Sequence, residues 1–210
     1  MKNVSTKTVV MVQVALFAAL IIIMANTPLG YIPLGFMNAT LIHIPVILGA
    51  VLMGPKQGAF LGFVFGLTSF IRNIMVPNLT SFVFNPFYSV GEVHGGFGSV
   101  IICFVPRILI GVIPFFIYKL LYHFLKNKKS GQYIALGAAG VAGSLTNTIL
   151  VMTLIVVFFK DSYSQAMGYA ANAIYGAVGA IIVTNGIPEA IIAAVIVAFV
   201  GKVLMQFWKK

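Results

Sequence analysis

Carboxylate side chains are the scarcest functional groups in this chain. Only three of its 210 residues are Asp or Glu, and charged residues of both signs make up 8% of the sequence, against about 25% in a soluble domain. Three acids provide no paired carboxylates for metal-dependent catalysis and little for coupling to protons or sodium ions. The scarcity therefore argues against a metal-dependent enzyme and against an ion-coupled pump.

Several catalytic motifs are missing as well. The sequence has no G-x-x-x-x-G-K-[ST] phosphate loop, no H-E-x-x-H and no G-x-S-x-G, so the chain is not expected to hydrolyse ATP itself. Cys103 is the single cysteine, which excludes an internal disulfide and leaves a Cys/His metal site without support. Despite a formal net charge of +10, no basic face or aromatic stacking platform for nucleic acid is evident. We expect no cofactor, no metal and no nucleic-acid partner.

Long apolar runs are what the sequence has instead. Hydrophobic residues make up 60% of it, more than a soluble fold can bury, so the solvent must be lipid. At roughly 20 residues per crossing, the length allows about six transmembrane helices and no sizeable soluble domain. The first run, residues 8–24 behind Lys2 and Lys7, is longer than the apolar part of a signal peptide and is interpreted as a retained helix. The predicted fold is an all-α integral membrane protein, a six-transmembrane-helix bundle forming one domain over residues 1–210.

Breaks between the apolar runs set the expected boundaries. A loop at 27–38 is rich in Pro and Gly, and 160–172 is predicted to be a polar connector. The longer segment 76–98 holds polar residues and glycines, so we expect it to be structured but not a plain helix. The six spans are expected at about 8–26, 39–53, 58–75, 99–125, 133–159 and 174–207.

Two of these spans are expected to be irregular. Pro106 and Pro114 are predicted to kink the fourth span, because proline removes a helical hydrogen bond and its ring clashes with the preceding turn. The sixth span is expected to be entered through an irregular or interfacial piece before Gly179.

The placement of basic residues predicts the orientation. If the chain starts in the cytoplasm, ten lysines fall at cytoplasmic ends, whereas Lys160, Arg72 and Arg107 fall toward the other side. Cytoplasmic loops carry an excess of Lys and Arg, so both termini are expected in the cytoplasm and segment 76–98 outside. The ten lysines are Lys2, Lys7, Lys56, Lys119, Lys126, Lys128, Lys129, Lys202, Lys209 and Lys210.

Three charged residues, Arg72, Arg107 and Glu189, stand inside or at the edge of apolar spans. A charge there costs about 2.5–3.5 kcal/mol on insertion scales, so such residues usually face a protein interior and have a function. Residues three or four apart share a helix face, which places Asn185 beside Glu189. Thr68, Ser69 and Asn73 lie beside Arg72, Thr40 lies beside His43, and Ser144, Asn147 and Thr148 form one face.

These groups share a depth in the outer half of the predicted bundle and can converge on one polar chamber, covered by segments 27–38 and 76–98. If Arg107 and Glu189 pair, one positive charge remains, which a carboxylate would neutralise. The sequence therefore predicts capture of a small, polar, anionic molecule from outside. The candidate substrate-binding residues are His43, Arg72, Asn85, Arg107, Asn147, Asn185 and Glu189.

Alternatives stay open at this point. Arg72 could extend to the interface, Arg107 and Glu189 could form a purely structural ion pair, Asn147 could only link helices, and His43 could be a buried core imidazole. A membrane enzyme on a lipid-linked substrate is disfavoured by the missing acidic motifs. A small channel is disfavoured because the cytoplasmic halves of the spans are nearly all apolar.

The order of the spans and their local sequences resemble those of a known family. Ala15 and Ala19 form an A-x-x-x-A pattern on the first span, of the kind that permits close helix approach. The segments HIPVILGAVLMGPKQGAFLGFVFGLTSF at 43–70, GSLTNT at 143–148 and NGIPEAIIAA at 185–194 complete the match. Over essentially its full length the chain resembles the substrate-binding S-components of energy-coupling factor (ECF) vitamin transporters, most of all the pantothenate-specific members.

The resemblance implies a role, partners and site residues. S-components bind a vitamin from outside and dock on a module of one transmembrane coupling protein and two ATPase subunits, which use the ATP. The family contacts the coupling protein through the alanine motif, here Ala15 and Ala19, and gates the site with the first loop, here 27–38. For pantothenate, Arg72 or Arg107 would hold the carboxylate. Folate, riboflavin and biotin are the alternative vitamins, whereas cationic thiamine fits poorly.

Overall fold

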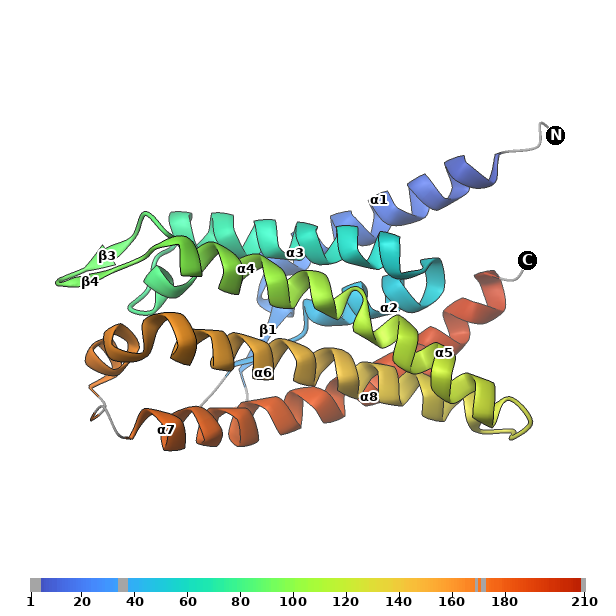
Figure 1. Ribbon diagram of the computed structural model, residues 1–210. Coiled ribbons are helices and arrows are strands. Elements are labelled where there is room, and N and C mark those ends of the chain that lie inside the picture. The colour runs from blue at the N-terminus through green and yellow to red at the C-terminus, as the bar shows by residue number, and fades with distance from the viewer. Residues whose placement is uncertain (1–4, 34–37, 169, 171–172, 209–210) are drawn as a thin grey trace.

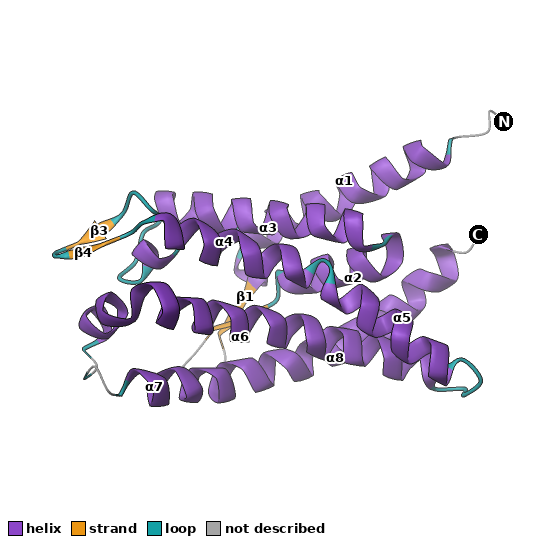
Figure 2. Cartoon of the chain, in the orientation of Figure 1, coloured by secondary structure: helices purple, strands orange, loops and turns teal. Residues whose placement is uncertain are grey.

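The computed structural model describes residues 5–33, 38–168, 170 and 173–208, most of them helical (Figures 1 and 2). The helices run lengthwise, with both chain termini at one end of the bundle and the β3–β4 hairpin at the other (Figure 1). The helices are α1 Thr6–Ala25, α2 His43–Met53, α3 Pro55–Met75, α4 Phe97–Ile110, α5 Ile113–Leu125, α6 Gly131–Met167, α7 Ile174–Ile181 and α8 Ile187–Trp208. The strands are β1 Tyr31–Pro33, β2 Asn38–Thr40, β3 Ser89–Val90 and β4 Val93–His94.

Five helical segments of the described chain are long and apolar enough to cross a bilayer, and α2 is a shorter apolar helix. The prediction of a mainly helical chain with several apolar helices of membrane-spanning length is therefore confirmed. The five segments are Thr6–Ala25, Pro55–Met75, Phe97–Leu125, Gly131–Met167 and Ile174–Phe207.

The second predicted span is shorter than expected. Helix α2 begins at His43, so the predicted start at residue 39 is wrong. The preceding residues pair instead as strand β2 with β1, with Tyr31 opposite Thr40. Eleven residues at 1.5 Å each cover about 16 Å, roughly half of a hydrocarbon core. Residues 34–37 between β1 and β2, part of the predicted lid, lie outside the described residues.

The fourth predicted span divides into two helices. Pro106 lies inside α4, and the helix ends at Ile110, followed by Gly111. Pro114 lies in the first turn of α5, where a missing N–H leaves no hydrogen bond unmade. The interruption thus falls at Gly111 and Val112, just ahead of the second proline, and not at the prolines themselves.

The fifth predicted span ends at the expected residue, but at a kink and not at a loop. The helical stretch α6 continues through Met167, and two helices meet across a kink at Phe159 (φ −135°, ψ 27°). The predicted polar connector is therefore wrong over residues 160–167, where the polar side chains lie on a helix. Gly168 ends the helix at φ +69°, a left-handed conformation that favours glycine. Residues 169 and 171–172 of the predicted connector lie outside the described residues.

The sixth predicted span is irregular, but at a different place. Helix α7 is regular through Gly179, and the irregularity is a π-helical turn at Ile182–Gly186 that joins α7 to α8. The irregular entry expected before Gly179 is therefore wrong for residues 174–178, whereas the interfacial alternative stays a prediction. A π-helical turn widens the helix by one residue and is frequent at functional sites; here it carries Asn185.

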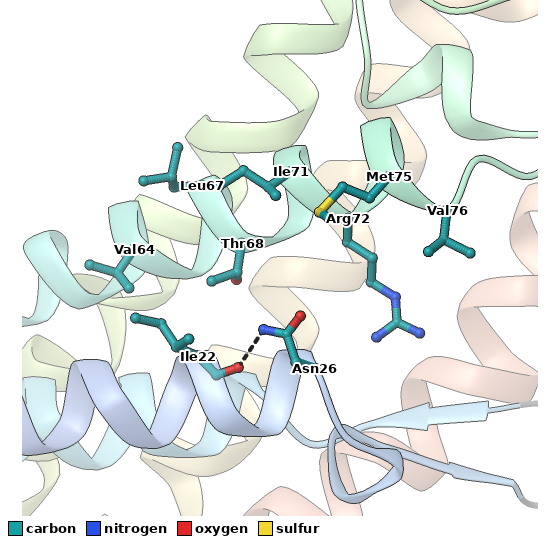
Figure 3. A pocket seen from close by; sticks show the side chains of 9 residues that line it. All are labelled: Ile22, Asn26, Val64, Leu67, Thr68, Ile71, Arg72, Met75 and Val76. Atoms are coloured by element: carbon teal, nitrogen blue, oxygen red, sulfur yellow. Dashed lines mark hydrogen bonds between the residues drawn. The ribbon is translucent and has the colours of Figure 1, made fainter.

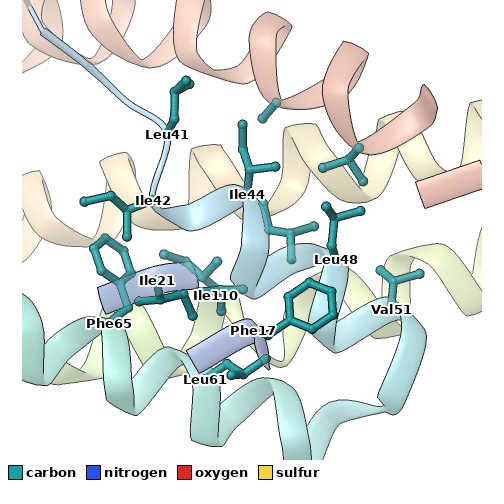
Figure 4. Packing of buried hydrophobic residues seen from close by; sticks show 14 of the residues in the cluster. Phe17, Ile21, Leu41, Ile42, Ile44, Leu48, Val51, Leu61, Phe65 and Ile110 are labelled. Carbon is teal, nitrogen blue, oxygen red and sulfur yellow. The ribbon is translucent and has the colours of Figure 1, made fainter. Parts of the chain in front are cut away.

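Two hydrophobic clusters hold the bundle together. The larger one surrounds α2, whose residues from His43 to Val51 are all buried, and takes side chains from α1, α3, α6 and α8 (Figure 4). The smaller one joins Phe82 and Val83, in the 3₁₀ turn Ser81–Val83, to α4, α6 and α7. The first cluster is centred on α2, and the second lies nearer the β3–β4 hairpin.

Glycines bring α3 and α4 into close contact. A Cβ at Gly62 would meet the main-chain carbonyl of Arg107 and come within 2.9 Å of the Cα of Ile108, and a Cβ at Gly58 would meet the carbonyl of Gly111. Small residues four apart let the backbones of two membrane helices approach closely. The glycine stripe therefore fixes the position of Arg107 relative to α3.

Candidate functional site

A polar cavity of about 400 Å³ lies beside Thr40, just beyond the N-terminal end of α2. This volume is within the range of small-molecule sites, about 300–1,000 Å³. Its apolar wall includes Phe65 of the α2-centred cluster and Phe84, which packs against the second cluster. The cavity is lined by Thr40, Phe65, Ser69, Arg72, Asn73, Val76, Asn78, Thr80, Phe84, Arg107 and Asn147.

Arg107 is positioned by a defect in its own helix. Pro106 has no main-chain N–H, so it cannot bond the carbonyl of Ile102 four residues earlier. The Arg107 guanidinium donates to that carbonyl through NH1 at 2.8 Å. A buried carbonyl without a donor costs free energy, so the proline creates an acceptor that holds this side chain.

Two aromatic rings complete the surroundings of Arg107. The guanidinium carbon lies 5.5 Å from the ring centre of Phe65 and 5.0 Å from that of Phe84. Both distances are within the range of a cation–π contact. Only 8% of Arg107 is exposed, and a positive charge in such a place attracts an anion more strongly than it does in water. Arg107 is therefore suited to bind a carboxylate.

Arg72 lies at the boundary between two hollows. Its guanidinium donates through NH1 to the carbonyl of Ala25, the last residue of α1. Besides the polar cavity, Arg72 lines a mainly apolar groove of about 410 Å³ between α1 and α3 (Figure 3). Arg72 is an exposed residue, unlike Arg107. The groove is lined by Ile22, Asn26, Val64, Leu67, Thr68, Ile71, Arg72, Met75 and Val76.

Asn147 brings an unused acceptor to the cavity wall. Its Oδ1 atom is buried and has no hydrogen-bond partner among the described residues, and the same holds for the hydroxyl of Ser144. A buried polar atom without a partner costs about 1–3 kcal/mol, so a donor on a bound molecule would find a favourable contact here. Asn147 is therefore suited to a hydroxyl or amide group.

His43 is fully buried at the start of α2, and neither ring nitrogen has a hydrogen-bond partner among the described residues. One turn further along α2, Ile47 reaches the position that a Cβ at Gly143 of α6 would occupy. His43 therefore lies on the side of α2 that faces α6. It does not line the cavity, although Thr40 beside it does.

The rim of the cavity is stiffened by local hydrogen bonds. Ser81 donates its hydroxyl to Oδ1 of Asn73 at 2.8 Å, and Asn78 Oδ1 accepts from the amide and the hydroxyl of Thr80, both at 3.0 Å. Asn73 in turn donates to the Ser69 carbonyl at 2.9 Å. These contacts fix the segment after α3 against the helix, so the rim is preformed.

Glu189 holds the β1–β2 hairpin. Its Oε1 accepts a hydrogen bond from the main-chain N–H of Thr40 at 2.7 Å, across 149 residues of sequence. Glu189 is buried, at 7% exposure, and itself does not line the cavity. It therefore contacts a residue that lines the cavity, Thr40, but not the cavity itself.

The structure thus brings Arg72, Arg107 and Asn147 to one cavity wall, as the sequence predicts. It does not bring Asn185 or Asn85 there. Asn185 is half-buried in the π-helical turn and accepts from the Thr184 hydroxyl at 3.3 Å. Asn85 accepts from the amide of Phe87 at 2.9 Å and shapes the loop after the 3₁₀ turn.

Several lining residues were not among the sequence candidates. The sequence already placed Ser69 and Asn73 beside Arg72 without naming them as candidates, and Phe65 lies one turn before Ser69, so helical spacing could have added it. Asn78, Thr80 and Phe84 lie in the irregular segment after α3, where no periodicity exists to place a side chain. Thr68, which the spacing paired with Arg72, lies in the α1–α3 groove.

Ala15 and Ala19 lie far from the cavity along α1. Both are exposed, and only Phe17, Ile21 and Ala25 of this helix are buried. Two small side chains one turn apart leave a shallow, smooth strip on which another helix can pack closely. The face of α1 that carries Ala15 and Ala19 is thus exposed at the surface of the bundle, where another helix could contact it.

Comparison with known proteins identifies the family of this chain. Residues 9–201 match the model of the family described as ECF transporter, substrate-specific component. The pantothenic acid transporter PanT of Lactococcus lactis is 41% identical over 158 residues, which cover 75% of this chain and 72% of that protein. The pantothenate transporter PanT of Leuconostoc mesenteroides is 32% identical over 209 residues, covering 96% and 94%. The chain therefore belongs to the substrate-specific components of ECF transporters, a family of multi-pass membrane proteins and not of enzymes.

Proposed function

We propose that this S-component captures pantothenate and delivers it across the membrane. One observation supports this substrate. Two arginines line the same cavity as Asn147, whose Oδ1 atom has no hydrogen-bond partner among the described residues. Pantothenate has one carboxylate, one amide and two hydroxyls, and it needs a cation together with a few hydrogen-bonding groups. The names of the two relatives support the same substrate.

The carboxylate and one hydrogen-bond donor of the ligand have partners in this proposal. Arg107 holds the carboxylate, because it is buried and its plane is set by the Ile102 carbonyl and two phenyl rings. Arg72, at the α1 side of the cavity, adds a second positive charge at the entrance. Asn147 accepts from a hydroxyl or from the amide N–H. Glu189 acts indirectly, through the hairpin that it holds.

The entrance lies on the outer side of the membrane in this proposal. The α2–α3 connection, the α5–α6 turn and both termini lie at one end of the bundle (Figure 1). Eight of the ten lysines that the sequence assigns to the cytoplasm belong to these parts of the chain, and Lys119 and Lys202 lie on α5 and α8, each six residues before the helix ends. The excess of positive charge on cytoplasmic segments supports placing this end inside, although Lys2, Lys209 and Lys210 lie outside the described residues.

Energy comes from partner subunits in this proposal. The chain has no phosphate-binding loop, so ATP is used by two ATPase subunits attached to a transmembrane coupling protein. Ala15 and Ala19 on the open face of α1 form the docking strip for that coupling protein. Residues 1–210 act as one substrate-binding domain that carries no cofactor of its own.

Calorimetry on the purified protein in detergent tests the substrate. Pantothenate, folate, biotin and riboflavin are titrated separately, together with pantothenol, in which a CH₂OH group replaces the carboxylate. We expect tight one-to-one binding of pantothenate, weaker binding of pantothenol and no binding of the other three vitamins. Tight binding of another vitamin would keep the family and refute the substrate. Equal affinity for pantothenate and pantothenol would refute the carboxylate contact.

A further inference from the structure

A groove of about 630 Å³ lies on the outer surface of α5, away from the polar cavity. The side chains of Phe116 and Leu120 are exposed along it, at 55% each. Helix α5 packs on its other side against α6 and α2. The groove is lined by Phe116, Tyr118, Lys119, Leu120, Tyr122, His123 and Lys126.

Basic side chains follow one edge of this groove. Lys119, His123 and Lys126 are four and three residues apart, so they share one face of the helix. All three are exposed. Lys128 and Lys129 follow in the turn before α6 and extend the positive charge past the end of the helix. The described part of the chain has no acidic residue in α5 or in this turn to offset it.

The apolar wall of the groove is fixed in place. The rings of Tyr118 and Tyr122 stack with their centres 5.5 Å apart and their planes at 10°. The Tyr118 hydroxyl donates to the Met205 sulfur of α8 at 3.3 Å, and Gln132 of α6 donates to the same sulfur at 2.8 Å. These contacts tie the wall to two further helices, so the groove is part of the folded structure.

Apolar and basic side chains lie side by side in this groove, so both parts of a phospholipid have a matching surface. The exposed apolar side chain of Phe116 comes first along the helix, Lys119 and Leu120 follow next to each other, and the basic side chains of His123 and Lys126 lie at its end. Tyrosines belong to the boundary between hydrocarbon and headgroups, which places Lys119, His123 and Lys126 at headgroup level. We propose that this groove binds an anionic phospholipid, with one acyl chain along Phe116 and Leu120 and the phosphate on the three basic side chains.

A protein partner is the competing occupant, and the observations favour lipid. The open strip of Ala15 and Ala19 lies on α1, which packs against α2 and α3, whereas the groove lies on α5, which packs mainly against α6. The proposed docking face and the groove are therefore built on different helices. Membranes also supply anionic lipid to basic side chains at the cytoplasmic surface, which matches the lysine-rich end of the bundle.

Native mass spectrometry of the full-length protein tests the proposal. The protein is released from detergent supplemented with equal amounts of phosphatidylglycerol and phosphatidylcholine, and the ratio of the two bound lipids is measured. The variant Lys119→Gln/Lys126→Gln removes two charges from the groove. The control Lys56→Gln removes an exposed charge at the same end of the bundle, on α3. Thermal unfolding and pantothenate binding are measured in parallel to show that each variant is folded.

The wild type and the Lys56→Gln control are expected to prefer phosphatidylglycerol. In the groove variant, the ratio of bound phosphatidylglycerol to phosphatidylcholine is expected to fall about fivefold for each lysine removed. Equal binding of the two lipids by the wild type would overturn the proposal. So would an unchanged preference in the folded groove variant. If that variant keeps its lipid preference but no longer associates with the coupling module, the groove is a protein contact and the lipid assignment is wrong.

Discussion

Arg107 donates a 2.8 Å hydrogen bond to the carbonyl of Ile102, the acceptor that Pro106 leaves without its helical donor. Three features of one helical turn are thus linked. The proline frees a carbonyl, the carbonyl holds a guanidinium, and the guanidinium faces the cavity. The hydrogen bond that Pro106 leaves unmade in α4 therefore helps to shape the wall of the cavity.

Replacing this proline separates its effect on the site from its effect on the helix. In Pro106→Ala, the new main-chain N–H competes with Arg107 for the Ile102 carbonyl. Because a hydrogen bond to a charged group contributes about 1.5–3 kcal/mol, we expect pantothenate affinity to fall about tenfold or more while thermal stability is kept or increased. Calorimetry and a thermal melt measure the two effects. Pro114→Ala is the control, since Pro114 lies in the first turn of α5 and frees no such carbonyl; an equal loss of affinity in both variants would contradict this role.

The two arginines are expected to differ in their contribution. Truncating one partner of a buried charge contact costs about 2–5 kcal/mol, so Arg107→Ala should lower pantothenate affinity by that amount, and Arg72→Ala, at an exposed residue, by less. The ratio of pantothenate to pantothenol affinity identifies the carboxylate partner, because only the variant that lacks it loses the preference. Unchanged affinity in both variants would rule out the carboxylate contact.

Glu189 is expected to control how fast the ligand leaves. It holds Thr40 of the hairpin, so Glu189→Ala should free strand β2 and raise the dissociation rate about tenfold, from the loss of a charged hydrogen bond. Glu189→Gln keeps an oxygen for the Thr40 amide and should have a smaller effect. Release of labelled pantothenate into excess unlabelled ligand gives the rates. If the two variants release the ligand equally fast, Glu189 does not act by accepting this hydrogen bond.

Helical spacing explains how much of the site could be predicted from the sequence. Arg72, Arg107 and Asn147 line one cavity because each lies on a helix, where depth and face follow from counting residues. Glu189 shows the limit of that reasoning. Its partner is a main-chain N–H of Thr40, and a pattern of side chains carries no information about which backbone group approaches a carboxylate.

The boundaries of the elements show the same limit. The sequence from 39 to 42 is apolar enough to continue a helix, yet pairing of β2 with β1 outside the helix decides where α2 starts. Polar residues 160–167 lie on a helix, because exposed helical positions accept them as well as a loop does. In both places tertiary contacts override the local preference.

Close packing of α3 on α4 is expected to be needed for binding. In Gly62→Ala the new methyl group meets the Arg107 carbonyl, and overpacking of this kind costs about 1–3 kcal/mol. We expect a lower melting temperature together with weaker pantothenate binding. Gly137→Ala on α6 is the matched control, because its nearest neighbour would be the Ala194 carbonyl at 3.6 Å, an ordinary contact. A Gly62→Ala protein that binds and melts like this control would show that α4 can shift without disturbing Arg107.

The alanine strip on α1 is expected to act in transport and not in binding. Ala15 and Ala19 are exposed, so a tryptophan at either position fits the isolated protein but holds a partner helix away. Ala15→Trp and Ala19→Trp should leave pantothenate affinity unchanged and abolish ATP-driven uptake in vesicles that contain the coupling module. Val195→Trp, at a position on α8 that is 52% exposed, controls for a bulky side chain on a lipid-facing surface. Because binding and uptake are measured on the same variants, loss of both would indicate misfolding of α1, and normal uptake would mean that the coupling protein docks elsewhere.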